Sequence, residues 1–315
     1  MPVPPPAPEH RLRALAALWV GVLCIGWSAI FVKLAGVPGV ASAFYRLLIP
    51  ALVLVPWRLA WDGPRPTRRL ALIAMAGGII HAANLVLWNS SLMLTSAAVA
   101  TLLAYNAPLW VGLGALILFR ERLTRGYWLG LGFAMAGIAV LMDLGALSHL
   151  RFNAGELLAT AGGVLYAGYL LITQRVRSQM DTLTFMALSV ASGALVLWAA
   201  NLALGIPLTG YPLRAWAALA GLGLVSHLAG WLAINYALGH LKAASVSVSL
   251  LGQVIVTTLL AIPILGEIPA VHQVLGGLLV LAGIYVVNRG QAGAGRCPGL
   301  RPPARRREVA EEELN

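Results

Sequence analysis

The sequence predicts an all-α integral membrane protein with ten transmembrane helices, built as two inverted repeats of five helices. Composition is the first observation behind this prediction. Of the 315 residues, 59% are hydrophobic and 10% are charged, whereas soluble domains have about 45–50% apolar and about 25% charged residues. The mean hydropathy is +0.82. The polar residues cannot cover a soluble globule, so lipid is expected to surround most of the chain.

The second observation is a series of ten apolar runs, each long enough to cross the hydrocarbon core as a helix. Continuous runs favour helices over barrel strands, which are short and alternate in polarity. The expected spans are residues 14–35, 40–60, 70–93, 95–119, 125–143, 154–174, 183–204, 214–238, 243–265 and 270–288.

The basic residues predict the orientation. If the N-terminus is cytoplasmic, every Lys and Arg except Lys33, Arg46, Arg151 and Arg214 falls on the inner side. Cytoplasmic segments of membrane proteins carry such an excess, so both termini are expected inside, in the cytoplasmic (inner) membrane. The net charge of +11 does not indicate nucleic-acid binding, because no basic folded face is evident.

Both ends of the chain are expected to lie outside the bilayer. Residues 1–13 form a Pro-rich cytoplasmic arm and not a signal peptide, because the apolar run that follows is too long for one. Residues 290–315 are rich in Gly, Pro and charge, which predicts a disordered basic cytoplasmic tail.

The third observation is an internal repeat. Residues 71–141 align without a gap on residues 217–287, which places His81 on His227 and Glu121 on Glu267. The repeats are expected at 14–145 and 150–289. Because each holds five helices, an odd number, the second is inverted relative to the first. Secondary transporters use inverted repeats, with the substrate site near the middle of the bilayer.

Two segments resemble a known family. NSSLMLTSAAVATLLAYNAPLWVGLGALILFRERLTRGYWLGLGFAMAGIAVL (89–141) resembles the EamA-type unit of the drug/metabolite transporter superfamily, and residues 235–287 resemble its second copy. The shared marks are small residues opening the fourth helix, a Glu just beyond it and an LAG-like close to the fifth. They read Ala97-Ala98, Glu121 and Ala136-Gly137, then Ala243-Ala244, Glu267 and Ala282-Gly283.

The resemblance implies a carrier of small solutes, since family members resemble exporters of amino acids and metabolites, drug efflux proteins, and nucleotide-sugar or sugar-phosphate carriers. One position departs from internal symmetry. Pro108 in the fourth helix aligns with Val254 in the ninth. The fourth and ninth helices therefore need not bend alike, because only the fourth has a helix-breaking proline at this position.

Polar and aromatic residues inside the spans are the candidate substrate-binding residues, because polar groups in a membrane usually face a cavity or a partner. His81, Asn84 and Trp88 share one face of the third helix, and His227 and Trp231 share one face of the eighth. Histidine donates, accepts and takes up a proton near neutral pH. The alternative is ordinary packing, with each His bonded to a neighbouring helix carbonyl. The other candidates are Trp27, Tyr105, Asn106, Trp110, Tyr166, Tyr169 and Gln253.

Some charged and small residues have structural interpretations. Lys33 and Arg46 are expected near the outer side, where they attract an anionic group or extend to the interface. Glu121 stands between two arginines, which predicts a local salt bridge. Gly130 and Gly137, and their repeats Gly276 and Gly283, predict close helix packing between the halves or between protomers, which leaves a homodimer open.

The sequence therefore predicts a secondary transporter that exports amino acids or related amphipathic metabolites by alternating access. The alternatives are multidrug efflux, a nucleotide-sugar or sugar-phosphate carrier, and a lipid-handling membrane protein. No catalytic, metal-binding or nucleotide-binding motif is present, so we expect no enzyme activity, cofactor or metal. The expected partners are a small solute and the lipid bilayer.

Overall fold

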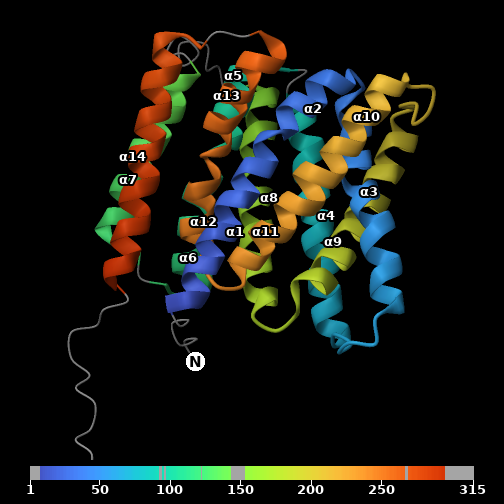
Figure 1. Cartoon of the computed structure of the whole chain (residues 1–315), viewed down its shortest axis with the longest axis horizontal. Helices are drawn as coiled ribbons and strands as arrows, with labels where there is room; N and C mark the ends of the chain where they lie inside the picture. The colour runs from blue at the N-terminus through green and yellow to red at the C-terminus, as the bar shows by residue number, and fades with distance from the viewer. Residues whose placement is uncertain are drawn as a thin grey trace, which may run out of the picture.

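The computed structural model of the chain describes residues 8–91, 94–95, 97–121, 123–142, 153–266 and 269–294. All regular elements in these ranges are helices, which confirms the all-α prediction (Figure 1). The first half contains α1 (Pro8–Gly26), α2 (Ser28–Ala35), α3 (Gly39–Ala60), α4 (Arg68–Ser91), α5 (Ala97–Ala104), α6 (Ala107–Leu118) and α7 (Arg125–Leu141). The second half contains α8 (Ala154–Arg177), α9 (Thr182–Ala203), α10 (Leu213–Gly221), η2 (Leu222–Ala229), α11 (Gly230–Leu238), α12 (Ala243–Leu250), α13 (Gln253–Leu265) and α14 (Val271–Ala294).

Nine helical segments within the described ranges are long and apolar enough to cross a membrane. Each coincides with one of the expected spans. The remaining expected span, residues 125–143, contains the shorter apolar helix α7, which has 17 residues. The chain is therefore an integral membrane protein.

The first and last helices extend beyond their expected ends. Helix α1 begins at Pro8 instead of residue 14, because proline lacks an N–H and fits the first turn of a helix. Helix α14 continues to Ala294, so residues 290–294, expected in the tail, are helical. Residues 1–7 and 295–315, which contain the rest of the expected arm and tail, lie outside the described residues.

Four of the spans are interrupted along their length, which the apolar runs did not predict. The first breaks at Trp27, between α1 and α2. The fourth breaks at Tyr105 and Asn106, between α5 and α6, and the ninth breaks at Leu251 and Gly252, between α12 and α13. The eighth passes through the π-helix η2 between α10 and α11.

The breaks in the fourth and ninth spans occupy equivalent positions of the repeat, although only the fourth contains the proline. Asn106 is the N-cap of α6 and Pro108 lies in its first turn, where a missing N–H costs little. Gly252 is the N-cap of α13, and glycine lowers helix propensity by about 1 kcal/mol. Different residues therefore interrupt the two helices at the same place.

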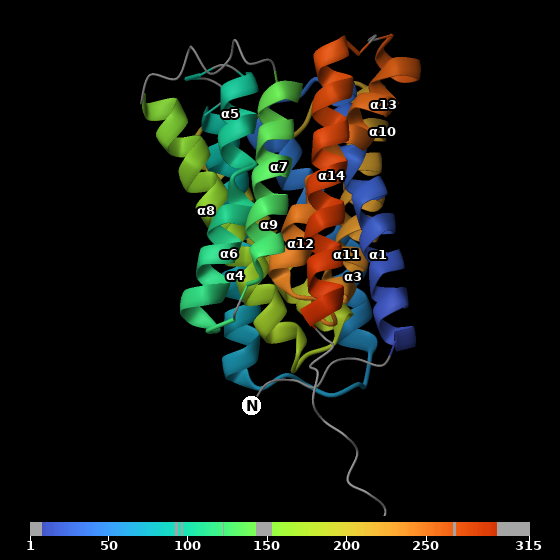
Figure 2. The same ribbon diagram turned by 90° about the vertical axis from the view of Figure 1, so that its left-hand side faces the viewer.

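Helices α7 and α14 lie side by side in two perpendicular views, Figures 1 and 2. A Cβ atom on Gly130 would lie 2.7 Å from the carbonyl oxygen of Gly283, and one on Gly137 would lie 2.7 Å from that of Gly276. The contact partner moves back along α14 as the position advances along α7, so the two helices are antiparallel. Small residues allow this approach, as predicted, and the helices they join belong to the two halves.

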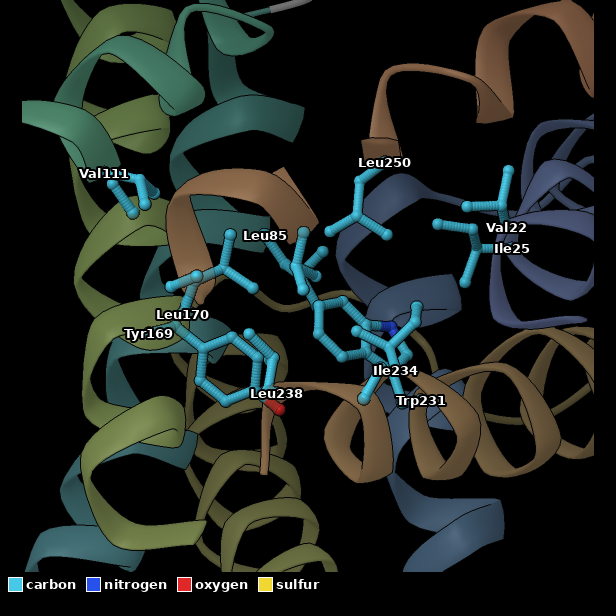
Figure 3. Packing of buried hydrophobic residues seen from close by; sticks show 14 of the residues in the cluster. Val22, Ile25, Leu85, Val111, Tyr169, Leu170, Trp231, Ile234, Leu238 and Leu250 are labelled. Atoms are coloured by element: carbon cyan, nitrogen blue, oxygen red, sulfur yellow. The ribbon is translucent and has the colours of Figure 1, made fainter. Parts of the chain in front are cut away.

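The interior of the bundle forms where helices of the first half pack against helices of the second half. Helix α4 packs against α8 and α9, while η2 and α11 pack against α1, and η2 also packs against α3. Figure 3 shows large buried side chains between these elements, including Tyr169 on α8 and Trp231 on α11. This interior holds the predicted site.

Replacing Gly137 with valine should lower the melting temperature of the purified protein in detergent. The new Cβ would lie 2.6 Å from the backbone nitrogen of Val280 and 2.7 Å from the carbonyl oxygen of Gly276, and overpacking costs about 1–3 kcal/mol. Gly132→Val is the matched control on the same helix, because a Cβ there meets no atom within 4 Å. Equal melting temperatures for the two variants would contradict the close approach.

Candidate functional site

The two predicted histidines meet in the interior. Their ring centroids are 5.8 Å apart, and His81 and His227 are 3% and 1% exposed. His81 stacks on Tyr169 at 4.6 Å and meets the edge of Trp231 at 5.1 Å. Tyr166 lies 6.0 Å from Trp231 and 6.3 Å from His81. We call these five residues the histidine–aromatic cluster.

The cluster is assembled from both halves. Helix α4 of the first half supplies His81, and the second half supplies His227 from η2, Trp231 from α11, and both tyrosines from α8. A π-helical turn, such as the one containing His227, widens the helix locally and is frequent at functional sites. The repeat predicted equivalent positions for the two histidines, and the structure brings them into one cluster.

Several polar atoms of the cluster are buried without a hydrogen-bond partner. They are both ring nitrogens of His81, Nδ1 of His227 and Nε1 of Trp231. An unpaired buried polar group costs about 1–3 kcal/mol. The alternative of histidines bonded to helix carbonyls therefore does not describe these atoms, and their concentration in one place marks a polar site.

The sequence interpretation placed Arg46 near the outer side, and the structure adds that it lies in electrostatic range of the cluster. Arg46 lies within α3, where its side chain is half-buried and its Nε atom is fully buried without a partner. It is close enough to interact electrostatically with Tyr105, Tyr166 and both histidines. The signal that could have found it is an arginine inside an apolar span, since such residues face the bundle interior.

Other predicted site residues serve helix packing. The Nδ2 atom of Asn84 donates a hydrogen bond to the carbonyl oxygen of Gly162 at 2.8 Å, which ties α4 to α8. The Oδ1 atom of Asn106 accepts a hydrogen bond from Nε1 of Trp110 at 2.9 Å. Asn106 also lies so close to Gly163 that a Cβ there would be 2.6 Å from Oδ1. Trp88 is half-buried farther along α4.

Trp27, Tyr105 and Gln253 are associated with the helix breaks. Trp27 forms the first break and stacks on Phe31, with ring centroids 5.5 Å apart. Tyr105 lies at the break between α5 and α6, and the half-buried Gln253 is the first residue of α13. A Cβ on Gly26 would lie 3.4 Å from the carbonyl oxygen of Gln253, so the first and ninth breaks are in contact.

Glu121 has partners far away in the sequence, in addition to the neighbouring arginines with which a local salt bridge was expected. Its Oε1 accepts a hydrogen bond from Nε2 of Gln174 at 3.0 Å, and its Oε2 lies 3.6 Å from Nζ of Lys242. Gln174 also accepts a hydrogen bond from the N–H of Ala243 at 2.6 Å. These partners belong to the second half. The physical reason is the left-handed backbone of Arg120, with φ 53°, which turns the chain after α6. The other expected partner, Arg122, lies outside the described residues.

Two hollows lie away from the cluster. One of about 530 Å³ is at the start of α4, and one of about 110 Å³ is beside α13. The first is lined by Arg68, Arg69, Leu72, Ile73 and Ala76. The second is lined by Thr257, Thr258, Ala261, Pro269 and Gln273. We therefore base the candidate site on the unpaired polar atoms of the cluster and not on the size of either hollow.

The fold and the buried cluster define a helical membrane protein with a polar site between its two halves. The chain belongs to the EamA-like transporter family, whose sequence profile matches residues 12–143 and 153–289. This confirms the resemblance seen in the sequence.

The relatives agree with this family. A protein of Streptantibioticus cattleyicolor named "Probable terminal-alkyne amino-acid exporter" is 28% identical over 300 residues, which cover 92% of this chain and all of the relative. A protein of Archaeoglobus fulgidus named "Uncharacterized transporter" is 25% identical over 87% of this chain and 96% of its own length. A solved crystal structure has a TM-score of 0.73 and 22% identity, and the match covers 89% of this chain and 98% of that chain. The last similarity supports the fold.

Two substitutions on α4 should separate packing from site chemistry. Asn84→Leu should lower the melting temperature in detergent, because loss of an interhelical hydrogen bond costs about 0.6–2 kcal/mol. His81→Phe should leave it unchanged or higher, because the ring stacking persists and no described hydrogen bond is lost. A larger loss of stability in His81→Phe than in Asn84→Leu would assign His81 a packing role.

Proposed function

We propose that this protein is a secondary transporter that exports amino acids or related amphipathic metabolites by alternating access. The observation that carries the proposal is the group of unpaired polar atoms at the interface of two structurally repeated halves. A solute with complementary donors and acceptors would satisfy them. The relative named as a probable amino-acid exporter supports the choice of solute.

We also propose that the halves are inverted copies and that α7 is the tenth span. Gly130 and Gly137 of α7 are the repeat equivalents of Gly276 and Gly283 of α14. The contacts join Gly130 to Gly283 and Gly137 to Gly276, which is the reciprocal pattern of a twofold axis. Equivalent helices that run antiparallel support inversion, and α7 pairs along its length with a helix that spans the bilayer.

The helix breaks support the same symmetry. The break in the fourth span packs on Gly163 of α8, the first helix of the second half. The break in the ninth span packs near Gly26 of α1, the first helix of the first half. The broken fourth-type helix of each half therefore packs against the first helix of the other half. Broken helices at the interface of inverted repeats are where many secondary transporters bind substrate.

Alternating access requires contacts between the halves that form in one state and break in another. The Glu121 network has this character, because Glu121 contributes from the first half while Gln174, Lys242 and Ala243 contribute from the second. Lys242 is half exposed, so its ion pair is weak enough to exchange with water. We propose that this network closes the cytoplasmic side, with both termini also on that side.

Transport is tested with purified protein in liposomes. Radiolabelled L-phenylalanine and L-leucine should show counterflow that depends on the protein. His81→Phe and His227→Phe should each reduce the initial rate about tenfold, the effect of losing a hydrogen bond of ~1.4 kcal/mol. Counterflow of a cationic dye without amino-acid counterflow would favour multidrug efflux, and movement of labelled lipid alone would favour a lipid-handling protein.

The proposed closure is tested with a single cysteine at Ser245, which is 6% exposed and lies near the network. In a background with Cys24 and Cys297 replaced by serine, Glu121→Gln should accelerate labelling of Ser245→Cys by a membrane-impermeant maleimide. Asp62→Asn is the control, because Asp62 is exposed in the link between α3 and α4. Equal labelling with and without Glu121→Gln would contradict the closure.

A further inference from the structure

Arg46 is a half-buried cation within a membrane span, and the proposed transport cycle gives it no role. It lies within α3, a helix that packs against η2, and it is in electrostatic range of Tyr105, Tyr166 and the two histidines. A charged side chain in this position is costly, and such residues usually pair with another charge or mark a solute pathway. The first question is therefore whether the chain supplies a counter-charge.

Among the residues that the structure describes, Arg46 has no ion pair with Asp or Glu and no hydrogen bond, and its Nε atom is buried and unpaired. The described carboxylates lie near helix ends or in links. They are Glu9, Asp62, Glu121, Glu156 and Asp181. Among the described residues, the guanidinium of Arg46 therefore has no carboxylate that neutralises it.

The groups around Arg46 complement one particular chemistry. A guanidinium matches a carboxylate through two parallel hydrogen bonds. The indole N–H of Trp231 is a second unpaired donor, and each neutral imidazole offers one acceptor and one donor. Tyr166 and Trp231 add aromatic faces for an apolar group.

We infer that Arg46 binds the carboxylate of the transported solute, so that the site selects carboxylates with an apolar remainder and excludes amphipathic amines. This inference rests on the proposed function and names its substrate class. An α-ammonium group is accommodated by the acceptor nitrogens of the histidines, whereas a solute without a carboxylate leaves Arg46 unpaired. The charge of Arg46 then repels a solute whose only charge is positive.

Binding tests the inference separately from transport. The intrinsic tryptophan fluorescence of the detergent-purified protein is titrated with 3-phenylpropanoate, which has the carboxylate alone, and with phenethylamine, which has the ammonium alone. We expect saturable binding of 3-phenylpropanoate and none of phenethylamine. Arg46→Gln should raise the Kd for 3-phenylpropanoate about tenfold or more, the effect expected for a hydrogen bond to a charged group.

Arg58→Gln is the matched control, because Arg58 lies at the exposed end of the same helix, where it donates to carbonyl oxygens of Trp61 and Pro64. Its Kd should equal that of the wild type. His81→Phe keeps Arg46 and should retain the preference for the carboxylate. A melting curve establishes that Arg46→Gln is folded, and Arg46→Lys, which keeps the charge, should bind more tightly than Arg46→Gln.

The outcomes distinguish this inference from the proposed function. Carboxylate binding that depends on Arg46, without counterflow of amino acids in liposomes, would support the site and reject the transport proposal. Counterflow of amino acids that persists in Arg46→Gln would support transport and overturn the role of Arg46. Equal affinity of the wild type for both probes, or no binding of 3-phenylpropanoate, would also overturn it.

Discussion

Inside a helical bundle surrounded by lipid, a polar atom finds a partner in the protein or remains unsatisfied at a free-energy cost. Most of the buried polar side chains that the structure describes have a hydrogen-bond partner in the protein. The amide of Asn201 donates to the carbonyl oxygens of Val40 and Leu197, and the hydroxyl of Ser192 donates to that of Met75. These bonds tie α9 to α3 and α4. Unpartnered atoms also occur elsewhere, as at Thr184 and Ser245, but the cluster at His81 combines several of them on adjacent rings.

One close seam of the scaffold joins α7 and α14, and none of the five cluster residues lies on either helix. Along α7 and α14, glycines bring two backbones together, and the side chains beside them include Ala134, Val280 and Val287. Contacts around the cluster are different, because they involve broken helices, a π-helix and rings that meet at 4.6–6.3 Å. In the proposed cycle, a close seam on one side and adaptable contacts in the centre would let the two halves tilt without separating. Packed interfaces change between discrete arrangements, which suits a carrier with two main states.

The sequence predicted those features that depend on composition and on the repeat. Hydropathy located the spans, because each apolar run is long enough to cross the bilayer. The repeat predicted that His81 and His227 are equivalent, whereas their approach to a ring-centroid distance of 5.8 Å comes from the structure. Hydropathy could not locate the breaks at Tyr105 and Leu251, because a turn between two apolar half-helices does not change the mean hydropathy.

The sequence did not predict the interaction partners of residues that are distant in sequence. Asn84 was predicted to belong to the site because it shares a helical face with His81, but its amide reaches Gly162 on another helix. Glu121 was assigned to its neighbours in sequence, but the backbone turn at Arg120 directs it to the second half. Arg46 was assigned by its position near the start of a span. In each case the sequence gives the residue type and the three-dimensional arrangement determines its partner.

The charge of the site also discriminates among the carrier types that the family contains. A phosphate monoester has about −1.5 to −2 charges at neutral pH, and a site for it is expected to gather several cations. The described residues at the cluster supply one, Arg46, together with neutral aromatic rings and two imidazoles. A cationic drug would place a second positive charge beside that guanidinium. A carboxylate with an apolar remainder would pair with Arg46 and pack on the aromatic rings. Amino acids carry such a carboxylate, and the imidazole acceptors would take their α-ammonium group, so the charge of the site favours the proposed solute over a solute whose only charge is positive.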